Sequence, residues 1–496
     1  MPATDETGRP PFGVPGLDEV FHDGIPPDSL VLVEGPPGSG KTTLGLQFLL
    51  QGVRDGETCL LLTNAESPGQ LERIAASHGW SLEGLHVVDW NEPADHRPGN
   101  GGAEYTLFPE AEVEVGETLR VLFAEIERLR PTRLVIDTIS LLRLLAPSPA
   151  FHRRQLRRIR EAVAGRSCAT LVIDDAQPTE KGLRGQTLVD GVVELTRAEF
   201  LYGGDRRQLR VRKLRGATYI GGAHDMKLIK GGLVVYPRLV AAEHATVDGL
   251  PPAVAGLEAL DRLAGAGLPR GSSTLVAGPA GTGKSTLCAA YASAAARRGE
   301  RCAVYLFDET PESFLARAEK LGLGLASAAE SGRLFLRNLD PAELTPGEIA
   351  HRIVHQVKED GVRLVVIDTV NGYLQSAAEE PMVMLHLREL LSFLGRSGVV
   401  TLLVLTQHGL LAPESAMPVD LSYMADNIFL LRFFEMEGGV RKALSVVKRR
   451  SGPHETTIRE LCMTERGITL SPPLKEFSRV LGERPRYHVP AGPDAS

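Results

Sequence analysis

Two glycine-rich segments have the residue types and the spacing of a phosphate-binding loop. Residues 35–42 read Gly-Pro-Pro-Gly-Ser-Gly-Lys-Thr, and residues 278–285 read Gly-Pro-Ala-Gly-Thr-Gly-Lys-Ser. Both match G-x-x-x-x-G-K-[ST], in which glycines let backbone N–H groups surround phosphate and the lysine reaches the β- and γ-phosphates. The alternative is a glycine-rich turn without a ligand, but one chance match is uncommon, and two matches in register between an apolar strand and a helix favour nucleotide binding. The predicted nucleotide-binding residues are Gly35, Gly38, Ser39, Gly40, Lys41, Thr42, Thr43, Gly278, Gly281, Thr282, Gly283, Lys284, Ser285 and Thr286.

An aspartate at the end of an apolar run is the second element of such a site. Leu134–Asp137 and Leu364–Asp368 each end in an acid that is followed by threonine. A carboxylate there holds the water shell of Mg²⁺, while the loop hydroxyl binds the ion directly. An isolated aspartate would be read as a strand cap, but its position behind a phosphate loop favours the metal role. The predicted Mg²⁺ residues are Thr42, Asp137, Ser285 and Asp368.

Acids that follow a second strand in each half are candidates for aligning the attacking water. Cys59–Glu66 is followed by Ser-Pro, and Ala303–Glu309 is followed by Thr-Pro. The alternative is a simple helix start, since Ser or Thr before proline caps a helix well. We expect Ser67 and Thr310 to cap, which leaves the acids free. The predicted catalytic residues are Glu66, Asp308 and Glu309.

These elements recur because the chain contains an internal duplication. Residues 24–35 reappear at 267–278, an offset of 243 residues, and the offset from Asp137 to Asp368 is 231. A repeat of this length indicates two copies of one domain. We attribute the change in offset to residues 91–116, predicted to be a surface loop. The predicted organisation is a first domain at 1–240, a linker at 241–252, a second domain at 253–473 and a partly ordered tail at 474–496.

Short apolar strands alternate with helical stretches of 12 or more residues in each copy. That alternation predicts a mostly parallel sheet with helices on both faces. The expected class is therefore α/β, in two tandem phosphate-loop domains.

The bulk composition restricts the functional class. The 496 residues carry a net charge of −7, which argues against a protein that coats nucleic acid. Five cysteines are scattered without metal-ligand spacing, and the N-terminus has no apolar signal region. We expect a cytoplasmic protein without a membrane segment.

Taken together, these motifs resemble the KaiC family, two-domain members of the RecA-like superfamily. The resemblance runs from Gly16 to about Leu470 and includes the lead-ins at 16–18 and 256–258. It implies that ATP and Mg²⁺ bind between the protomers of a ring, expected to be a hexamer, and that regulatory protein partners exist.

The resemblance also covers a basic group near the end of each domain. In this family such groups reach into the neighbouring protomer's site, where a cation stabilises charge on the transferring phosphoryl group. Both groups are expected on edge strands, Leu209–Leu214 and Ala443–Val447, and a solvated strand end is the alternative. The residues concerned are Lys213, Arg215, Lys448 and Arg450.

The family pairs two acids after the second strand, and the first of them aligns water. The second copy keeps both, as Asp308 and Glu309, whereas Ala65 replaces the first acid of the first copy. Slower hydrolysis in the first domain is therefore expected. Lys284→Ala inactivates the second phosphate loop, so that the remaining hydrolysis comes from the first domain. In that variant, Ala65→Glu should raise steady-state phosphate release, and an unchanged rate would contradict the assignment.

Family members also phosphorylate a Ser-Thr pair in the second domain. Here Ser422 matches the serine and Tyr423 replaces the threonine. Ser422 is a candidate site of autophosphorylation, and an ordinary turn serine is an equal alternative.

Two other functions stay open at this point. A RecA- or RadA-like DNA recombination ATPase would need basic loops, and the best candidate is the stretch 152–160 with five arginines. Those arginines also fit a solvated helix face, so nucleic-acid binding is disfavoured. The other function is a nucleotide-dependent switch that hydrolyses ATP slowly. It cannot be distinguished from a KaiC-like ATPase when turnover is low.

Overall fold

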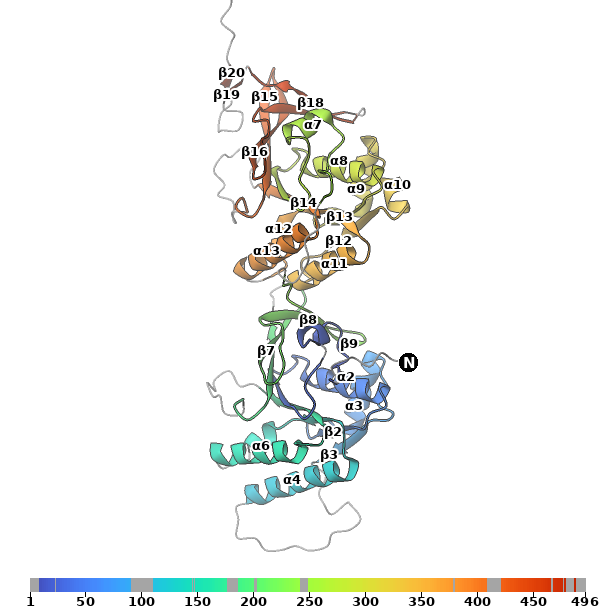
Figure 1. The fold of residues 1–496 in the computed structure, drawn as a ribbon, viewed down its shortest axis with the longest axis vertical. Coiled ribbons are helices and arrows are strands. Elements are labelled where there is room, and N and C mark those ends of the chain that lie inside the picture. Colours follow the sequence, from blue (N-terminus) through green and yellow to red (C-terminus); the bar gives the residue numbers. More distant parts are fainter. Residues whose placement is uncertain are drawn as a thin grey trace, which may run out of the picture. The chain divides into compact units, whose positions relative to one another are not determined.

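A computed structural model describes residues 9–22, 24–90, 110–144, 146, 148–175, 186–199, 203–240, 249–377, 380–407, 421–464, 467–475, 477–478 and 486–487. The chain divides into two compact units, Met1–Arg238 and Leu239–Ser496, called unit 1 and unit 2 below (Figure 1). Residues 241–248 of the predicted linker lie outside the described residues.

Unit 1 is built on a sheet of nine strands in the order β3-β2-β4-β5-β1-β6-β7-β8-β9. The strands from β3 to β6 in this order pair in parallel, and β7 to β9 continue the sheet antiparallel. Its elements are α1 Leu17–Val20, β1 Leu30–Gly35, α2 Lys41–Arg54, β2 Cys59–Thr63, α3 Pro68–His78, β3 His86–Asp89, α4 Glu110–Leu129, β4 Arg133–Asp137, α5 Ser140–Leu144, α6 Pro149–Val163, β5 Ala169–Asp175, β6 Gly191–Ala198, β7 Arg206–Leu214, β8 Ala223–Ile229 and β9 Gly232–Tyr236.

Unit 2 repeats this arrangement in the order β12-β11-β13-β14-β10-β15-β16-β17-β18. Beyond β18, the short strands β19 and β20 pair with each other. Its elements are α7 Glu258–Leu263, β10 Ser273–Pro279, α8 Lys284–Arg297, β11 Arg301–Leu306, α9 Pro311–Lys320, α10 Leu325–Glu330, β12 Leu334–Asn338, α11 Pro346–Lys358, β13 Val362–Asp368, α12 Val370–Leu374, α13 Glu380–Arg396, β14 Val400–Gln407, β15 Asn427–Met436, β16 Gly439–Arg449, β17 Arg459–Thr464, β18 Gly467–Pro473, β19 Phe477–Ser478 and β20 Arg486–Tyr487. The expected tandem α/β fold, with helices flanking mostly parallel sheets, is confirmed.

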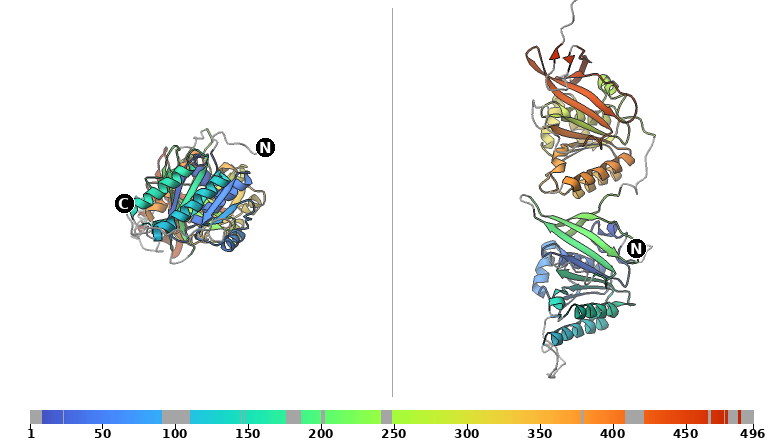
Figure 2. Two further views of the ribbon diagram at one scale, coloured as in Figure 1. Left: turned by 90° about the horizontal axis from the view of Figure 1, so that it is seen from below. Right: turned by 90° about the vertical axis from the view of Figure 1, so that its left-hand side faces the viewer.

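The central parallel strands of unit 1 are apolar on both faces, because helices cover both faces there. In β1, Val31 and Val33 belong to the core that includes α2 and α3, whereas Leu30 and Leu32 face the core that includes α4 and α6. Helices α4 and α6 lie together on one side of the sheet, drawn in teal in Figure 2. A strand that is covered on both faces has apolar residues at every position, and the sequence shows these strands as continuous apolar runs.

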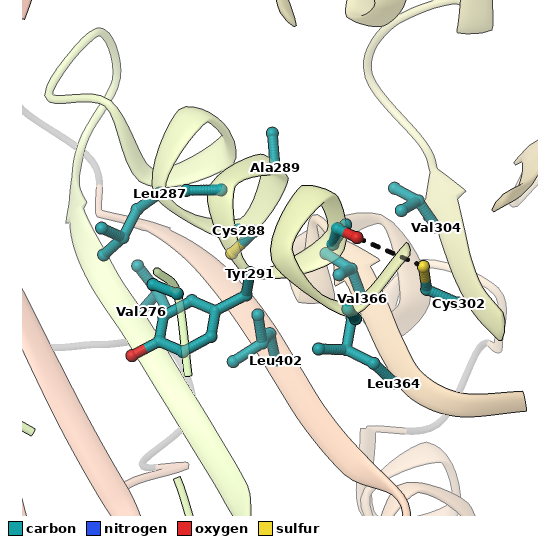
Figure 3. Packing of buried hydrophobic residues seen from close by; sticks show 14 of the residues in the cluster. Val276, Leu287, Cys288, Ala289, Tyr291, Cys302, Val304, Leu364, Val366 and Leu402 are labelled. Atoms are coloured by element: carbon teal, nitrogen blue, oxygen red, sulfur yellow. Dashed lines mark hydrogen bonds between the residues drawn. The ribbon is translucent and has the colours of Figure 1, made fainter. Parts of the chain in front are cut away.

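The equivalent core of unit 2 packs a helix directly against the sheet. Helix α8 places Leu287, Cys288 and Tyr291 against Val276 of β10 and Leu402 of β14 (Figure 3). These buried contacts hold the N-terminus of α8 at the end of β10. The phosphate loop between the two elements is therefore positioned by the core.

Two predictions about local structure are wrong. Helix α4 begins at Glu110, so residues 110–116 of the predicted loop are helical, and residues 91–109 lie outside the described residues. The acid-rich start hides the apolar period, although acids favour a helix N-terminus. Strands β7 and β16 are not edge strands, because β8 pairs with β7 and β17 pairs with β16, although these pairings end at Arg210 and Leu444 and do not extend to the basic groups.

Candidate nucleotide sites at the two phosphate loops

Both glycine-rich loops adopt backbone conformations that require glycine. Gly40 and Gly283, which precede α2 and α8, have φ of 104° and 101°, a region that residues with a Cβ rarely occupy. A Cβ on Gly35 would overlap the Leu195 carbonyl, and one on Gly278 would overlap a carbonyl of β15. Each loop therefore lies directly against the next strand of its sheet.

The loop lysines are buried and held by the loops themselves. The Nζ atom of Lys41 donates to the carbonyls of Gly35 and Pro36 at 2.8 and 3.0 Å. Lys284 Nζ donates to the Pro279 carbonyl at 2.8 Å. Burial lowers the pKa of Lys284 to about 8, and Asp368 opposes that effect. An anionic ligand at the loop would stabilise the charged form of this lysine.

A hydroxyl and a carboxylate meet at the base of each loop. Thr42 Oγ1 donates to Asp137 Oδ2 at 2.8 Å. In unit 2, the Ser285 hydroxyl lies near Asp368 and lowers the pKa of that carboxyl, against the larger effect of burial. Burial raises the pKa of both aspartates to about 6. Each aspartate ends its strand as the sequence predicts and is joined to the next threonine by a cis peptide bond.

This arrangement fits Mg²⁺ bound together with a nucleotide. Asp368 Oδ2 is buried and has no hydrogen-bond partner among the described residues, so a metal-bound water or an ion would satisfy it. No three His, Cys, Asp or Glu side chains cluster as a metal site within the described part of the chain. Mg²⁺ typically takes one or two protein ligands and completes its shell with phosphates and water.

The candidate water-aligning acids differ between the units. Glu309 accepts two hydrogen bonds from the Arg317 guanidinium at 2.6 and 2.7 Å. Asp308 Oδ2 accepts from Thr369 Oγ1 at 2.8 Å, and the Asp308 side chain is exposed. In unit 1, Glu66 is half-buried and has no ion-pair partner among the described residues. Unit 2 therefore holds its acids more firmly than unit 1.

The helix caps beside these acids are confirmed. Thr310 accepts a hydrogen bond from the Ser313 backbone N–H at 3.3 Å, and its proline begins α9. Ser67 precedes α3, and its backbone N–H donates to the Gln70 side chain at 2.9 Å. The acids were expected to be left free by these caps, but this is wrong for Glu309, because Arg317 binds both of its carboxylate oxygens.

The lysine of each basic group is bound within its own chain. Lys213 Nζ donates to the Val189 carbonyl at 2.6 Å. Lys448 Nζ donates to the carbonyls of Ser422 and Ala425 at 2.7 and 2.8 Å. Both lysines fasten the segment that leads into the neighbouring strand, β6 or β15.

The arginine of each basic group is more exposed. Arg215 lies 3.9 Å from Asp190, and Arg450 lies 3.0 Å from Asp426. Their side chains are 53% and 59% exposed, respectively. Exposed ion pairs of this kind contribute little to stability, about 0–1 kcal/mol. These guanidinium groups are therefore free to exchange partners at low cost.

Acids at the end of β5 were not predicted as part of the site. Asp175 Oδ1 lies 2.9 Å from Lys41 Nζ, and the Asp174 carboxylate pairs with Arg143 at 2.8 Å. The available signal was the run Leu171–Asp175, an apolar strand that ends in acid as the Mg²⁺ strands do.

Arginines that were not predicted also lie beside the loop of unit 1. Arg197 of β6 lies so close to Gly38 that an added Cβ would be 2.9 Å from its guanidinium, and Arg207 Nε donates to the Gly38 carbonyl at 3.3 Å. At Gly281 of unit 2 the corresponding neighbour is Phe433. The two loops therefore have different surroundings, one cationic and one aromatic.

The arginine-rich stretch forms helix α6, and its arginines line a solvated face. Arg153 and Arg157 are exposed, whereas Leu156 and Ile159 are buried. Arg158 covers the Phe123 ring at 5.3 Å. These contacts are those of an ordinary amphipathic helix.

Comparisons with known proteins agree across both units. A family model described as "ATPase: KaiC" matches residues 11–240 and 253–475. The "Circadian clock protein KaiC3" of Synechocystis sp. is 27% identical and is aligned over 98% of this chain and 96% of its own length. The "Circadian clock oscillator protein KaiC" of Picosynechococcus sp. is 24% identical over 95% of this chain and 91% of that protein. In the described part of the chain, every helix is too short or too polar to cross a membrane.

Proposed function

Because this chain belongs to the KaiC family of ATPases, we propose that both of its units bind Mg-ATP, that it hydrolyses ATP, and that its protomers form a hexameric ring with nucleotide between them. The observation that carries this proposal is the hydrogen bond between the loop hydroxyl of Thr42 and Asp137, together with Ser285 near Asp368 in the equivalent place of unit 2. A regulatory role with protein partners accompanies it.

Each group has a distinct task in this proposal. The loop N–H groups and Lys41 or Lys284 hold the phosphates, and the loop hydroxyl and its aspartate hold Mg²⁺. Bound Mg²⁺ supplies charge neutralisation at the β- and γ-phosphates. The acids after β2 and β11 orient the attacking water.

The basic groups complete the site from the adjoining protomer. Arg215 and Arg450 are the better candidates for contact across the interface, because Lys213 and Lys448 already bind carbonyls of their own chain. The lysines then support the segment that presents the arginines. A site built in this way becomes competent when the ring closes.

Assembly should depend on nucleotide. Size-exclusion chromatography with light scattering should report about six chains per particle with Mg-ATP and a smaller species without it, because a nucleotide shared between protomers stabilises the contact. Lys41→Ala/Lys284→Ala protein is the matched control and should remain small in both conditions. A particle of the same size with and without ATP would contradict nucleotide-dependent assembly.

Ser422 is the proposed site of a secondary autokinase activity. The turn that contains it is held by Lys448, which fixes the serine in front of β15. After incubation with Mg-ATP, mass spectrometry should find phosphate on Ser422, and Ser422→Ala should abolish it. An active ATPase with unmodified Ser422 would remove this part of the proposal.

The DNA recombination ATPase is the second candidate, and the solvated arginines of α6 give it no specific support, because an ordinary amphipathic helix explains them. Salt-sensitive binding of DNA that Arg153→Ala and Arg157→Ala abolish would favour it. A cytoplasmic location belongs to the proposal as well, supported by the five free cysteines.

A further inference from the structure

The loop lysine of unit 1 is occupied by an acid from a neighbouring strand. Among the described residues, its ammonium contacts the carbonyls of Gly35 and Pro36 and, at 2.9 Å, the carboxylate of Asp175. An ammonium group has three donors, so this lysine is fully engaged. A phosphate that binds Lys41 must therefore displace an existing partner, and Asp175 is the anionic one.

Unit 2 has no acid at the equivalent position. Strand β5 pairs with β1 so that Asp175 stands beside Gly35, and β14 pairs with β10 so that Thr406 stands beside Gly278. The backbone N–H of each residue is anchored alike, Asp175 to the Ser140 hydroxyl at 3.1 Å and Thr406 to an amide oxygen at 2.9 Å. Unit 1 thus has a carboxylate where unit 2 has a hydroxyl.

The charge of Asp175 is compensated differently from that of its neighbour. Asp174 pairs with Arg143 at 2.8 Å, and the Ser140 hydroxyl lies 2.8 Å from Asp174 and 3.2 Å from Asp175. Within the described residues, the ion-pair partner of Asp175 is Lys41, and the Asp175 side chain is 44% exposed. If phosphate takes Lys41, the carboxylate of Asp175 loses its counter-ion and remains close to the phosphate.

We propose that Asp175 determines nucleotide specificity in unit 1 by disfavouring the γ-phosphate. The inference rests on nucleotide binding at this loop, as proposed above. Because the loop lysine reaches the β- and γ-phosphates, a carboxylate at its ammonium faces the end of a triphosphate. A diphosphate lacks the terminal charge and is repelled less. In unit 2, the residue at the equivalent position is Thr406, which adds no negative charge beside the loop.

The two units should therefore differ in which nucleotide they retain. Unit 1 should have a lower ratio of ATP affinity to ADP affinity than unit 2. It would hold a diphosphate under conditions in which unit 2 holds a triphosphate.

The test measures both affinities in the full chain with one site disabled. In Lys284→Ala protein, calorimetry with Mg²⁺ gives the affinity of unit 1 for ADP and for a non-hydrolysable ATP analogue. Asp175→Thr should raise the analogue-to-ADP affinity ratio about tenfold, and Asp175→Asn should change it in the same direction. Glu127→Gln removes a carboxylate of helix α4 that pairs with Arg166 and should leave the ratio unchanged.

The reverse exchange tests the same idea in unit 2. In Lys41→Ala protein, Thr406→Asp should lower the analogue-to-ADP ratio by a similar factor. A ratio unmoved by both exchanges overturns the inference while nucleotide binding stands. A fall in analogue affinity on Asp175→Thr overturns it too, because Asp175 would then support the triphosphate. If unit 1 binds neither nucleotide in any variant, the proposed function of that unit fails and the inference fails with it.

Discussion

Two inactive variants of this chain should restore part of each other's ATPase activity when they are mixed. Lys284→Ala removes the phosphate contact of unit 2, and Arg450→Ala removes the exposed cation that follows β16. In each variant alone, turnover by unit 2 should be at least about 100-fold lower. An arginine supplied in trans raises kcat by a factor of about 10³–10⁵ in related phosphoryl transfers. Both proteins carry Glu66→Gln, which suppresses hydrolysis in unit 1.

Random mixing predicts the size of the recovery. In an equal mixture, about one quarter of the interfaces combine an intact loop from one protomer with an intact Arg450 from the next. Phosphate release should therefore recover to about one quarter of the level of the Glu66→Gln parent. In rings shown to contain both variants, the activity could instead stay at the average of the separate variants. That result would mean that Arg450 acts within its own chain or has no role in turnover.

A matched substitution on the same strand controls for loss of charge. Arg441 of β16 pairs with Glu437 at 2.8 Å and with Glu460 at 3.3 Å. Arg441→Ala should keep nearly full turnover and should need no complementation. A loss equal to that of Arg450→Ala would indicate a general effect of β16 and not a specific cation.

The second large effect is expected at the acid that unit 1 lacks. In the Glu66→Gln background, Asp308→Asn should reduce turnover about 100-fold, within the usual range of about 10²–10⁴ for a positioned acid–base group. One carboxylate oxygen of Asp308 is held by Thr369, and the other has no partner among the described residues. That oxygen is available to orient water. ATP affinity, measured separately by calorimetry, should change little.

The neighbouring acid provides the comparison. Glu309→Gln keeps a hydrogen-bond acceptor for Arg317, whose guanidinium contacts both carboxylate oxygens of Glu309. Turnover should fall less than about tenfold, as expected for an acid that is already bound. If Glu309→Gln has the larger effect, the water-orienting role belongs to Glu309, and Ala65 would no longer explain slow hydrolysis in unit 1.

The fold class could be predicted from the sequence because its signals are local. Continuous apolar runs such as Leu364–Asp368 correspond to strands buried on both faces. The glycine pattern specifies a backbone conformation, which Gly40 and Gly283 adopt. Connections between parallel strands are almost always right-handed, and this rule then restricts how the strands that carry the phosphate loop and the acid can be arranged.

What the sequence could not predict depends on contacts between distant segments. The pair of Lys41 with Asp175 requires that β5 lie beside β1, and nothing local to Asp175 indicates that neighbour. The strands of the basic groups were expected at sheet edges because each group lies near the end of its domain, whereas β8 and β17 continue the sheets beyond them. The first turns of α4 were assigned to a loop because their alternating acids have no helical period.

The hydrogen bonds of Lys448 join two parts of unit 2 that the proposal treats separately. Arg450 lies two residues beyond this lysine, and the carbonyls that Lys448 contacts belong to the turn that contains Ser422. A neighbouring chain that binds and moves Arg450 would therefore also move the turn that contains Ser422, because the hydrogen bonds of Lys448 connect the two. Subunit contact and the geometry of that serine would change as a single mechanical event.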